Sequence, residues 1–82
     1  MSAWIIQGNS EFDNEFANLP PEIQLELHPM MHEVVTNSTL EDLDFLNHIE
    51  GTDLYFFTTH DERYTIAFEI IHFNIIQFLV CF

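Results

Sequence analysis

The chain has almost no positive charge. Its 82 residues contain one Lys or Arg, which is Arg63, against 14 Asp and Glu, so the formal net charge is −13 with His neutral. Lys and Arg supply most of the non-specific affinity of proteins for nucleic acids and attract proteins to anionic membranes. The sequence therefore argues against direct binding to nucleic acid or to a membrane, and it favours a basic protein surface as partner.

Cysteine, glycine and long apolar runs are also scarce. With Cys81 as the one cysteine, no intrachain disulfide can form. With Gly8 and Gly51 as the only glycines, a glycine-rich phosphate loop is excluded. The most apolar tract, 66–82, is interrupted by polar residues and is shorter than the ~20 residues of a membrane-spanning helix. The start of the chain lacks the positive region of a signal peptide, so we expect a cytoplasmic protein.

Apolar residues, by contrast, are plentiful. They make up 48% of the chain and include nine Phe, which separates this sequence from disordered acidic chains. A chain of this length buries roughly 60% of its unfolded surface. We therefore expect one domain over residues 1–82, with one core and no deep cleft between lobes.

The first half of the sequence predicts one strand and two helices. Residues 3–7 are rich in β-formers and precede a turn, and Ser10 is placed to cap a helix through residue 19. Pro20-Pro21 should begin a second helix, whose apolar stripe is Ile23, Leu27, Met30 and Val34. We expect Pro29 to kink or split that helix, and residues 40–46 to form one more turn.

The second half predicts three strands, at 54–59, 64–71 and 75–82, with short connections typical of an antiparallel meander. In the middle strand one face should carry Tyr64, Ile66, Phe68 and Ile70. The expected fold class is α+β, in the order β-α-α-β-β-β, with one antiparallel sheet packed on two helices.

Three segments carry a family resemblance. They are 11–24, which reads EFDNEFANLPPEIQ, 49–56, which reads IEGTDLYF, and 63–68, which reads RYTIAF. In this order they resemble the RelE/ParE/HigB toxin superfamily, especially its phage-associated HigB-like branch. The resemblance implies a RelE-like fold and, in the toxin–antitoxin members, a ribonuclease that cleaves ribosome-bound mRNA.

The chain departs from the family where the chemistry would lie. Thr65 occupies the position of the family's arginine in the Y-R-I-A-F strand, and the last strand, 75–82, has no basic residue. An enzyme acting on a polyanion needs preorganised positive charge. We therefore expect no catalytic residues. A divergent mRNA interferase that retains Tyr64, Arg63 and His60 is the alternative.

The acidic residues are the main candidate site. Glu11 and Glu15, and Glu22 and Glu26, are i,i+4 pairs that repel each other by ~0.2–0.5 kcal/mol per pair. Such repulsion suggests a compensating partner, and carboxylates at this spacing resemble a row of phosphates. The alternative is that acidity serves solubility. The residues expected to bind a partner are Glu11, Glu15, Glu22, Glu26, Glu33, Asp61 and Glu62, with the aromatic residues Tyr55, Phe57 and Phe73 in place of bases.

These observations predict a non-catalytic acidic inhibitor that blocks a basic, nucleic-acid-binding surface of another protein. A plain interaction module is a further alternative, with the C-terminal strand as a pairing edge that would allow a homodimer. His28 and His32 have a spacing that suits zinc, but Pro29 lies between them and no third ligand is implied. We expect neither a metal nor a cofactor, and we expect Cys81 to pack as a small hydrophobe.

Overall fold

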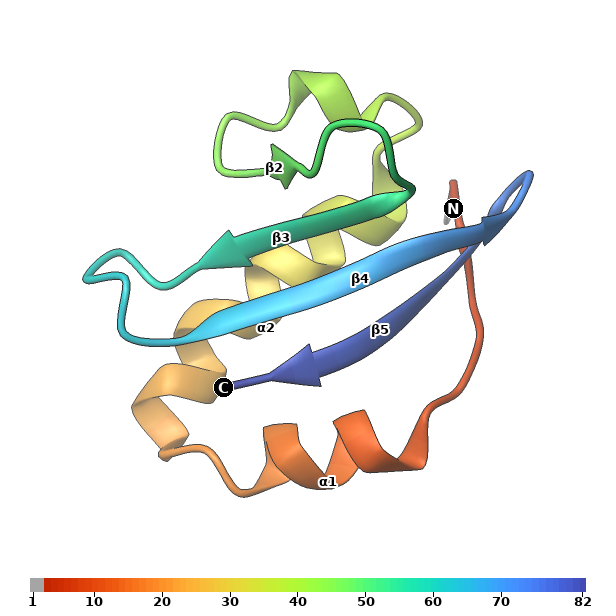
Figure 1. The fold of residues 1–82 in the computed structure, drawn as a ribbon. Coiled ribbons are helices and arrows are strands. Elements are labelled where there is room, and N and C mark those ends of the chain that lie inside the picture. Colours follow the sequence, from red (N-terminus) through yellow and green to blue (C-terminus); the bar gives the residue numbers. More distant parts are fainter. Residues whose placement is uncertain (1–2) are drawn as a thin grey trace.

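The computed structural model describes residues 3–82, which form one mixed sheet and two helices (Figure 1). Met1 and Ser2 lie outside the described residues, whereas the expected first strand at 3–7 lies within them. In chain order the elements are β1 (Ile5–Ile6), α1 (Ser10–Ala17), α2 (Pro21–Thr36), the 3₁₀ turn η1 (Leu40–Asp42), β2 (Asn47–His48), β3 (Leu54–Thr58), β4 (Thr65–His72) and β5 (Ile75–Cys81).

Helix α1 begins at Ser10, one residue earlier than a Ser10 cap would imply. Asn9 has the extended backbone of a cap, and its side-chain oxygen accepts from the N–H groups of Glu11 and Phe12. Its amide also donates to the carbonyl of Phe78, 3.0 Å away. Asn9 therefore replaces Ser10 as the N-cap, because its side chain caps the first turn of α1 and binds β5 at the same time.

Helix α2 is continuous through Pro29, so of the two expected outcomes, a kink or a split into two short helices, the split is wrong. Ile23, Leu27 and Val34 are buried along one side of it, and burial of this stripe holds both halves against the same sheet. Pro29 itself is exposed. The carbonyl of Leu25, which loses its N–H partner at Pro29, therefore lies on the solvent side. A missing hydrogen bond costs less free energy there than in a core.

The strand order is β1-β5-β4-β3-β2. The meander β3–β4–β5 is antiparallel as expected, and β2 adds an antiparallel strand that the sequence did not indicate. The expectation of a wholly antiparallel sheet is wrong at β1, where Ile5 and Ile6 pair in parallel with Ile75 and Ile76. The connection through α1 and α2 returns the chain in the direction that makes β1 and β5 parallel.

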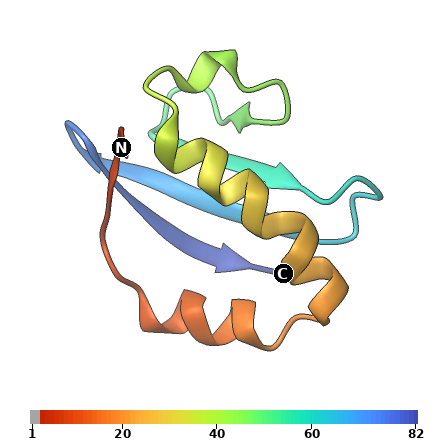
Figure 2. The same cartoon turned by 180° about the vertical axis from the view of Figure 1, so that it is seen from behind.

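One face of the sheet carries the core. Ile66 and Phe68 of β4 are buried there, and Tyr64 and Ile70 pack against the same cluster, which confirms the expected alternation. Helix α2 crosses this face, while α1 lies beside β5 (Figures 1 and 2). Phe12 joins α1 to the core by stacking on Phe78, with ring centroids 5.3 Å apart. No helix within residues 3–82 covers the other face, which is turned toward the reader in Figure 1.

The helices of the described chain are unsuited to crossing a bilayer, since none of them is both long and apolar enough.

Two leucines on α2 test this packing. Leu27 is fully buried, whereas Leu25 is 77% exposed on the same helix. We expect Leu27→Ala to lower the free energy of unfolding by about 2–5 kcal/mol, because it leaves a cavity, and Leu25→Ala to change it by less than about 0.5 kcal/mol. Urea denaturation followed by circular dichroism measures both, and equal losses would contradict the packing.

Candidate functional site

Three glutamates form a line along α2. Glu22, Glu26 and Glu33 are spaced at i, i+4 and i+11, which places them on one side of the helix. None of them belongs to the buried stripe. Glu22 and Glu33 are exposed, and Glu26 is half-buried, because its Oε2 accepts the backbone N–H of His60 from the β3–β4 hairpin.

The bond between Glu26 and His60 brings two more carboxylates to α2. Asp61 and Glu62 follow His60 in the hairpin, and both are exposed. Residues about 35 positions apart in the chain thereby meet on one surface. We call this surface, formed by Glu22, Glu26, Glu33, Asp61 and Glu62, the acidic face.

A buried threonine holds the hairpin in shape. Thr59 is 1% exposed, and its hydroxyl donates to Asp61 Oδ1 at 2.7 Å while accepting the N–H groups of Arg63 and Tyr64 at 3.2 Å. Glu62 has a φ of 62°, a left-handed conformation that the turn requires. The hairpin is thus preorganised. Sequence reasoning did not single out Thr59, although a Thr two residues before an Asp in a turn is a recognisable signal.

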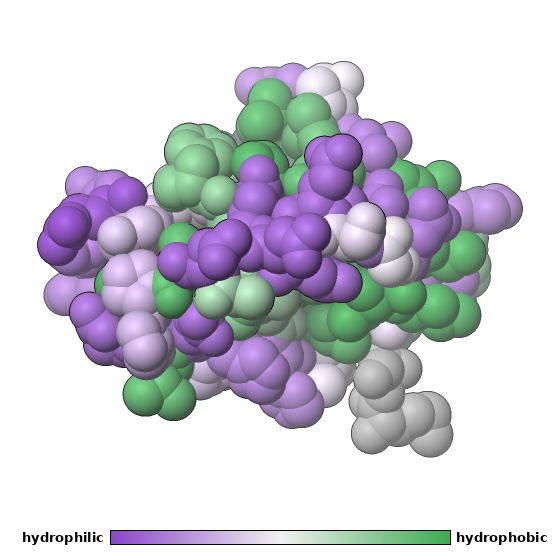
Figure 3. Space-filling model, turned by 90° about the horizontal axis from the view of Figure 1, so that it is seen from below, coloured by the Kyte–Doolittle hydropathy of each residue, from purple (hydrophilic) through white to green (hydrophobic). Residues whose placement is uncertain are grey.

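The two glutamates of α1 are not joined to the acidic face by the Glu26–His60 bond. Glu11 and Glu15 are exposed, and Glu15 Oε1 accepts the backbone N–H of Cys81 at 3.2 Å, so it is directed toward the end of β5. From below, where α1 faces the reader, hydrophilic side chains cover much of the centre of the molecule (Figure 3).

The aromatic candidates do not share one surface. Phe73 is 89% exposed in the β4–β5 turn. Tyr55 is half-buried between His48 and Phe68, with ring centroids at 4.5 and 5.4 Å, and burial together with the charges of Glu41 and Asp53 raises its pKa. Phe57 is fully buried. The expectation that Phe57 contacts a partner is therefore wrong, because its side of β3 faces the core.

The residues of the ribonuclease alternative meet in the β3–β4 hairpin. The guanidinium carbon of Arg63 lies 5.8 Å from the centre of the Tyr64 ring, and His60 is exposed three residues earlier. Asp61 and Glu62 stand between them in the chain. Two carboxylates beside one guanidinium give this segment a negative balance, which opposes the binding of a phosphate.

The end of the chain is not a free pairing edge. Strand β5 lies between β1 and β4, and beyond the short β1 its carbonyl at Phe78 and N–H at Cys81 bond to Asn9 and Glu15. The prediction that this strand is a pairing edge is therefore wrong. Burial, with the charge of Glu15 as the smaller cause, raises the pKa of the Cys81 thiol to about 11, so Cys81 packs as a hydrophobe.

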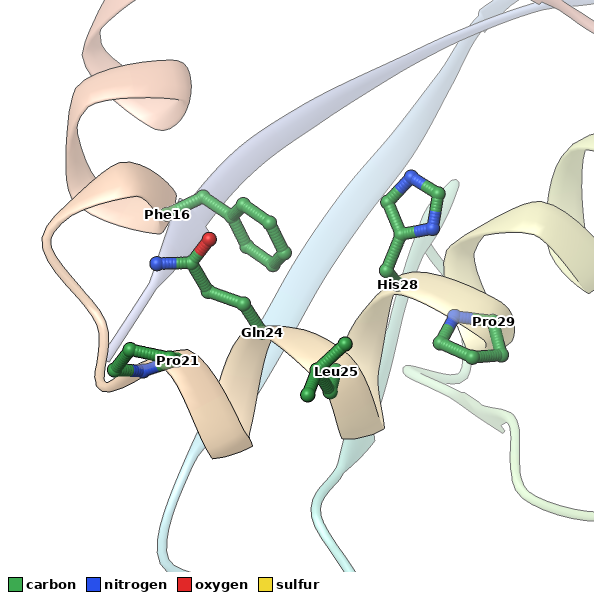
Figure 4. Close-up of a pocket in the computed structure, with 6 residues that line it drawn as sticks. All are labelled: Phe16, Pro21, Gln24, Leu25, His28 and Pro29. Carbon is green, nitrogen blue, oxygen red and sulfur yellow. The ribbon is translucent and has the colours of Figure 1, made fainter.

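An apolar groove of about 440 Å³ runs between α1 and α2. Its lining residues are Phe16, Pro21, Gln24, Leu25, His28 and Pro29 (Figure 4). Sequence patterns singled out only three of them, Pro21 and Pro29 as helix signals and His28 as a metal candidate. Within the described residues, no three His, Cys, Asp or Glu side chains converge as a metal site, so His28 takes part in the groove instead.

The pH dependence of stability should report on Asp61. The hydroxyl of Thr59, followed by the N–H of Arg63, lowers the pKa of this carboxyl. A lowered folded pKa gives stability that is present above the unfolded pKa, near 4, and is lost as the pH falls through the folded pKa. We expect the stability difference between wild type and Asp61→Asn to shrink as the pH falls below about 4, as measured by urea denaturation. A constant difference would contradict this.

The reactivity of Cys81 should report on its burial. A pKa near 11 leaves about 100-fold less thiolate than an ordinary thiol pKa near 9 would leave at neutral pH. Iodoacetamide should therefore modify the native protein at least about 100-fold more slowly than the urea-unfolded protein. Equal rates in the two states would show that Cys81 is accessible.

Comparison of the chain with protein-family models, with curated proteins and with solved structures gave no significant match.

Proposed function

We propose that this protein binds a basic surface of a nucleic-acid-handling protein through the acidic face and blocks that surface as a non-catalytic inhibitor in the cytoplasm. The observation that carries the proposal is the bond from Glu26 to His60. It joins the carboxylates of α2 to those of the hairpin, so that a dispersed acidic composition becomes one surface.

Charge supports a protein partner over other classes. With 14 acidic residues and one Lys or Arg, at least thirteen carboxylates have no Lys or Arg of their own. Such a surface repels itself and attracts cations, and its long-range field raises the rate of encounter with a basic protein. Glu22 and Glu26, one turn apart on α2, have Cβ atoms ~5–6 Å apart. A row of carboxylates at this spacing suits a partner whose basic surface normally binds a row of phosphates.

A RelE-like origin is part of this proposal. The element order, a strand, two helices and then an antiparallel meander, supports it, as does the Pro20-Pro21 junction between the helices. Against retained ribonuclease activity stands the local excess of Asp61 and Glu62 over Arg63. The proposed ancestry therefore supplies a scaffold, while the acidic face supplies the function.

Charge reversal tests the proposal. We choose Glu22→Lys with Glu62→Lys, because neither side chain forms a hydrogen bond with any residue in 3–82, whereas Glu26 holds the hairpin. Immobilised wild type should retain basic nucleic-acid-binding proteins from a lysate, and duplex DNA or added salt should release them, since ions screen charges beyond ~8 Å at physiological ionic strength. The double variant should lose this retention. Mass spectrometry of the eluates measures the outcome.

A matched control separates the acidic face from net charge. Asp44→Lys with Glu50→Lys makes the same change in net charge at exposed positions before and after β2, and it should retain the partners. The helix dipole makes lysine at residue 22 unfavourable by about 0.3–1 kcal/mol, so circular dichroism must show an intact fold. Equal loss in both double variants would reject the acidic face in favour of general acidity.

A further inference from the structure

The outer side of α2 carries an apolar ridge. Pro21, Leu25 and Pro29 follow at i, i+4 and i+8, opposite the buried stripe, and all three are exposed. Leu25, at 77% exposure, is among the most exposed large apolar side chains of the described residues. Phe16 extends from α1 toward this helix and forms the other wall of the groove (Figure 4).

Pro29 adds a polar feature to the ridge. A proline has no N–H, so the carbonyl of Leu25, four residues earlier, lacks its usual helical donor. Both residues line the groove. A backbone acceptor is therefore left open beside an apolar side chain, which is a place where a donor from another molecule gains a hydrogen bond.

The side chain of Gln24 supplies a second acceptor, its amide oxygen. Its Nε2 donates to the carbonyls of Leu19, at 2.8 Å, and Ala17, at 3.3 Å, so the donor side of the amide is used within the protein. The side-chain oxygen remains on the groove side, near Phe16 (Figure 4). With His28 as the exception, the polar groups that the groove offers to another molecule are therefore acceptors.

The acidic face borders the ridge along its length. Glu22 and Glu26 follow Pro21 and Leu25 by one residue each, so on the helix they form a parallel row turned by about 100°. An occupant that fills the groove is therefore brought within reach of these carboxylates. The surface combines an apolar slot, open acceptors and a negative rim.

We infer that the groove receives a basic amphipathic segment of the partner protein, in which one large apolar side chain enters between Phe16 and Leu25. Lysine or arginine side chains beside it bind Glu22, Glu26 and the open carbonyl of Leu25. This inference rests on the proposed function and names the chemistry of the partner. A second copy of this chain fits poorly, because it brings the same net charge of −13 and one Lys or Arg.

Two synthetic peptides of about 18 residues, long enough to form a helix, provide the probes. The first has leucine at i, i+3, i+4 and i+7 and lysine at most other positions, so that a helix has one apolar and one basic side. The second keeps every lysine and replaces each leucine with glutamine. Binding to the full chain is measured by calorimetry, and the contacted residues are mapped by ¹H–¹⁵N NMR. We expect the first peptide to shift Phe16, Leu25 and His28 and to bind at least about tenfold more tightly than the second.

Variants of the protein locate the contact. Leu25→Gln should weaken the leucine–lysine peptide by about tenfold, whereas Ile49→Gln, which changes an exposed isoleucine of the β2–β3 loop, should change it by less than about twofold. Pro29→Ala restores an N–H for the Leu25 carbonyl and removes part of the ridge, so it should also weaken binding. Thermal unfolding of each variant verifies the fold.

The outcomes separate the groove from the proposed function. If both peptides bind equally, and Glu22→Lys with Glu62→Lys abolishes binding while Leu25→Gln does not, charge alone acts and the groove inference is overturned. Shifts confined to the open face of the sheet, or self-association of the chain, also overturn it. If neither peptide binds at low salt, both the inference and the proposed function fail.

Discussion

The packing of the apolar side of α2 against the sheet is the contact on which the rest of the structure depends. Leu27 and Val34 of the helix are fully buried, as are Phe57 and Phe68 of the strands. Because a helix advances about 100° per residue, burial of one side also decides what the other sides present. One of these sides carries the line of glutamates, and another carries the ridge at Leu25. Both candidate binding surfaces are therefore consequences of a single helix–sheet contact.

Backbone N–H groups take the place that cations hold in most proteins. Glu15, Glu26 and Asp61 accept hydrogen bonds from the N–H groups of Cys81, His60 and Arg63. Bonds to an ionised carboxylate are stronger than neutral ones, and they need no Lys or Arg. This allows a chain with a charge of −13 to order some of its carboxylates while others, such as Glu22, remain available to a partner.

Local sequence signals located the helices and the long strands well. The alternation of Ile66 and Phe68 and the proline junction at Pro20-Pro21 appear in the structure where periodicity and proline geometry indicated. The misses have tertiary causes. Pro29 does not split α2, because Leu27 before it and Val34 after it are both buried in the same core. Composition is enough to indicate the acidic candidates, whereas the prediction for Phe57 is wrong because composition does not show which side of a strand faces the core.

The sequence by itself determined the sign of the surface charge, the presence of a core and the α+β class, because composition and periodicity are local properties. Only the tertiary structure decided that β1 lies parallel to β5, that Glu26 meets His60, and that Leu25 borders a groove with Phe16. These contacts join segments that are separate in the chain. Their geometry depends on how α1 and α2 pack against the sheet, and short-range sequence patterns do not contain that information.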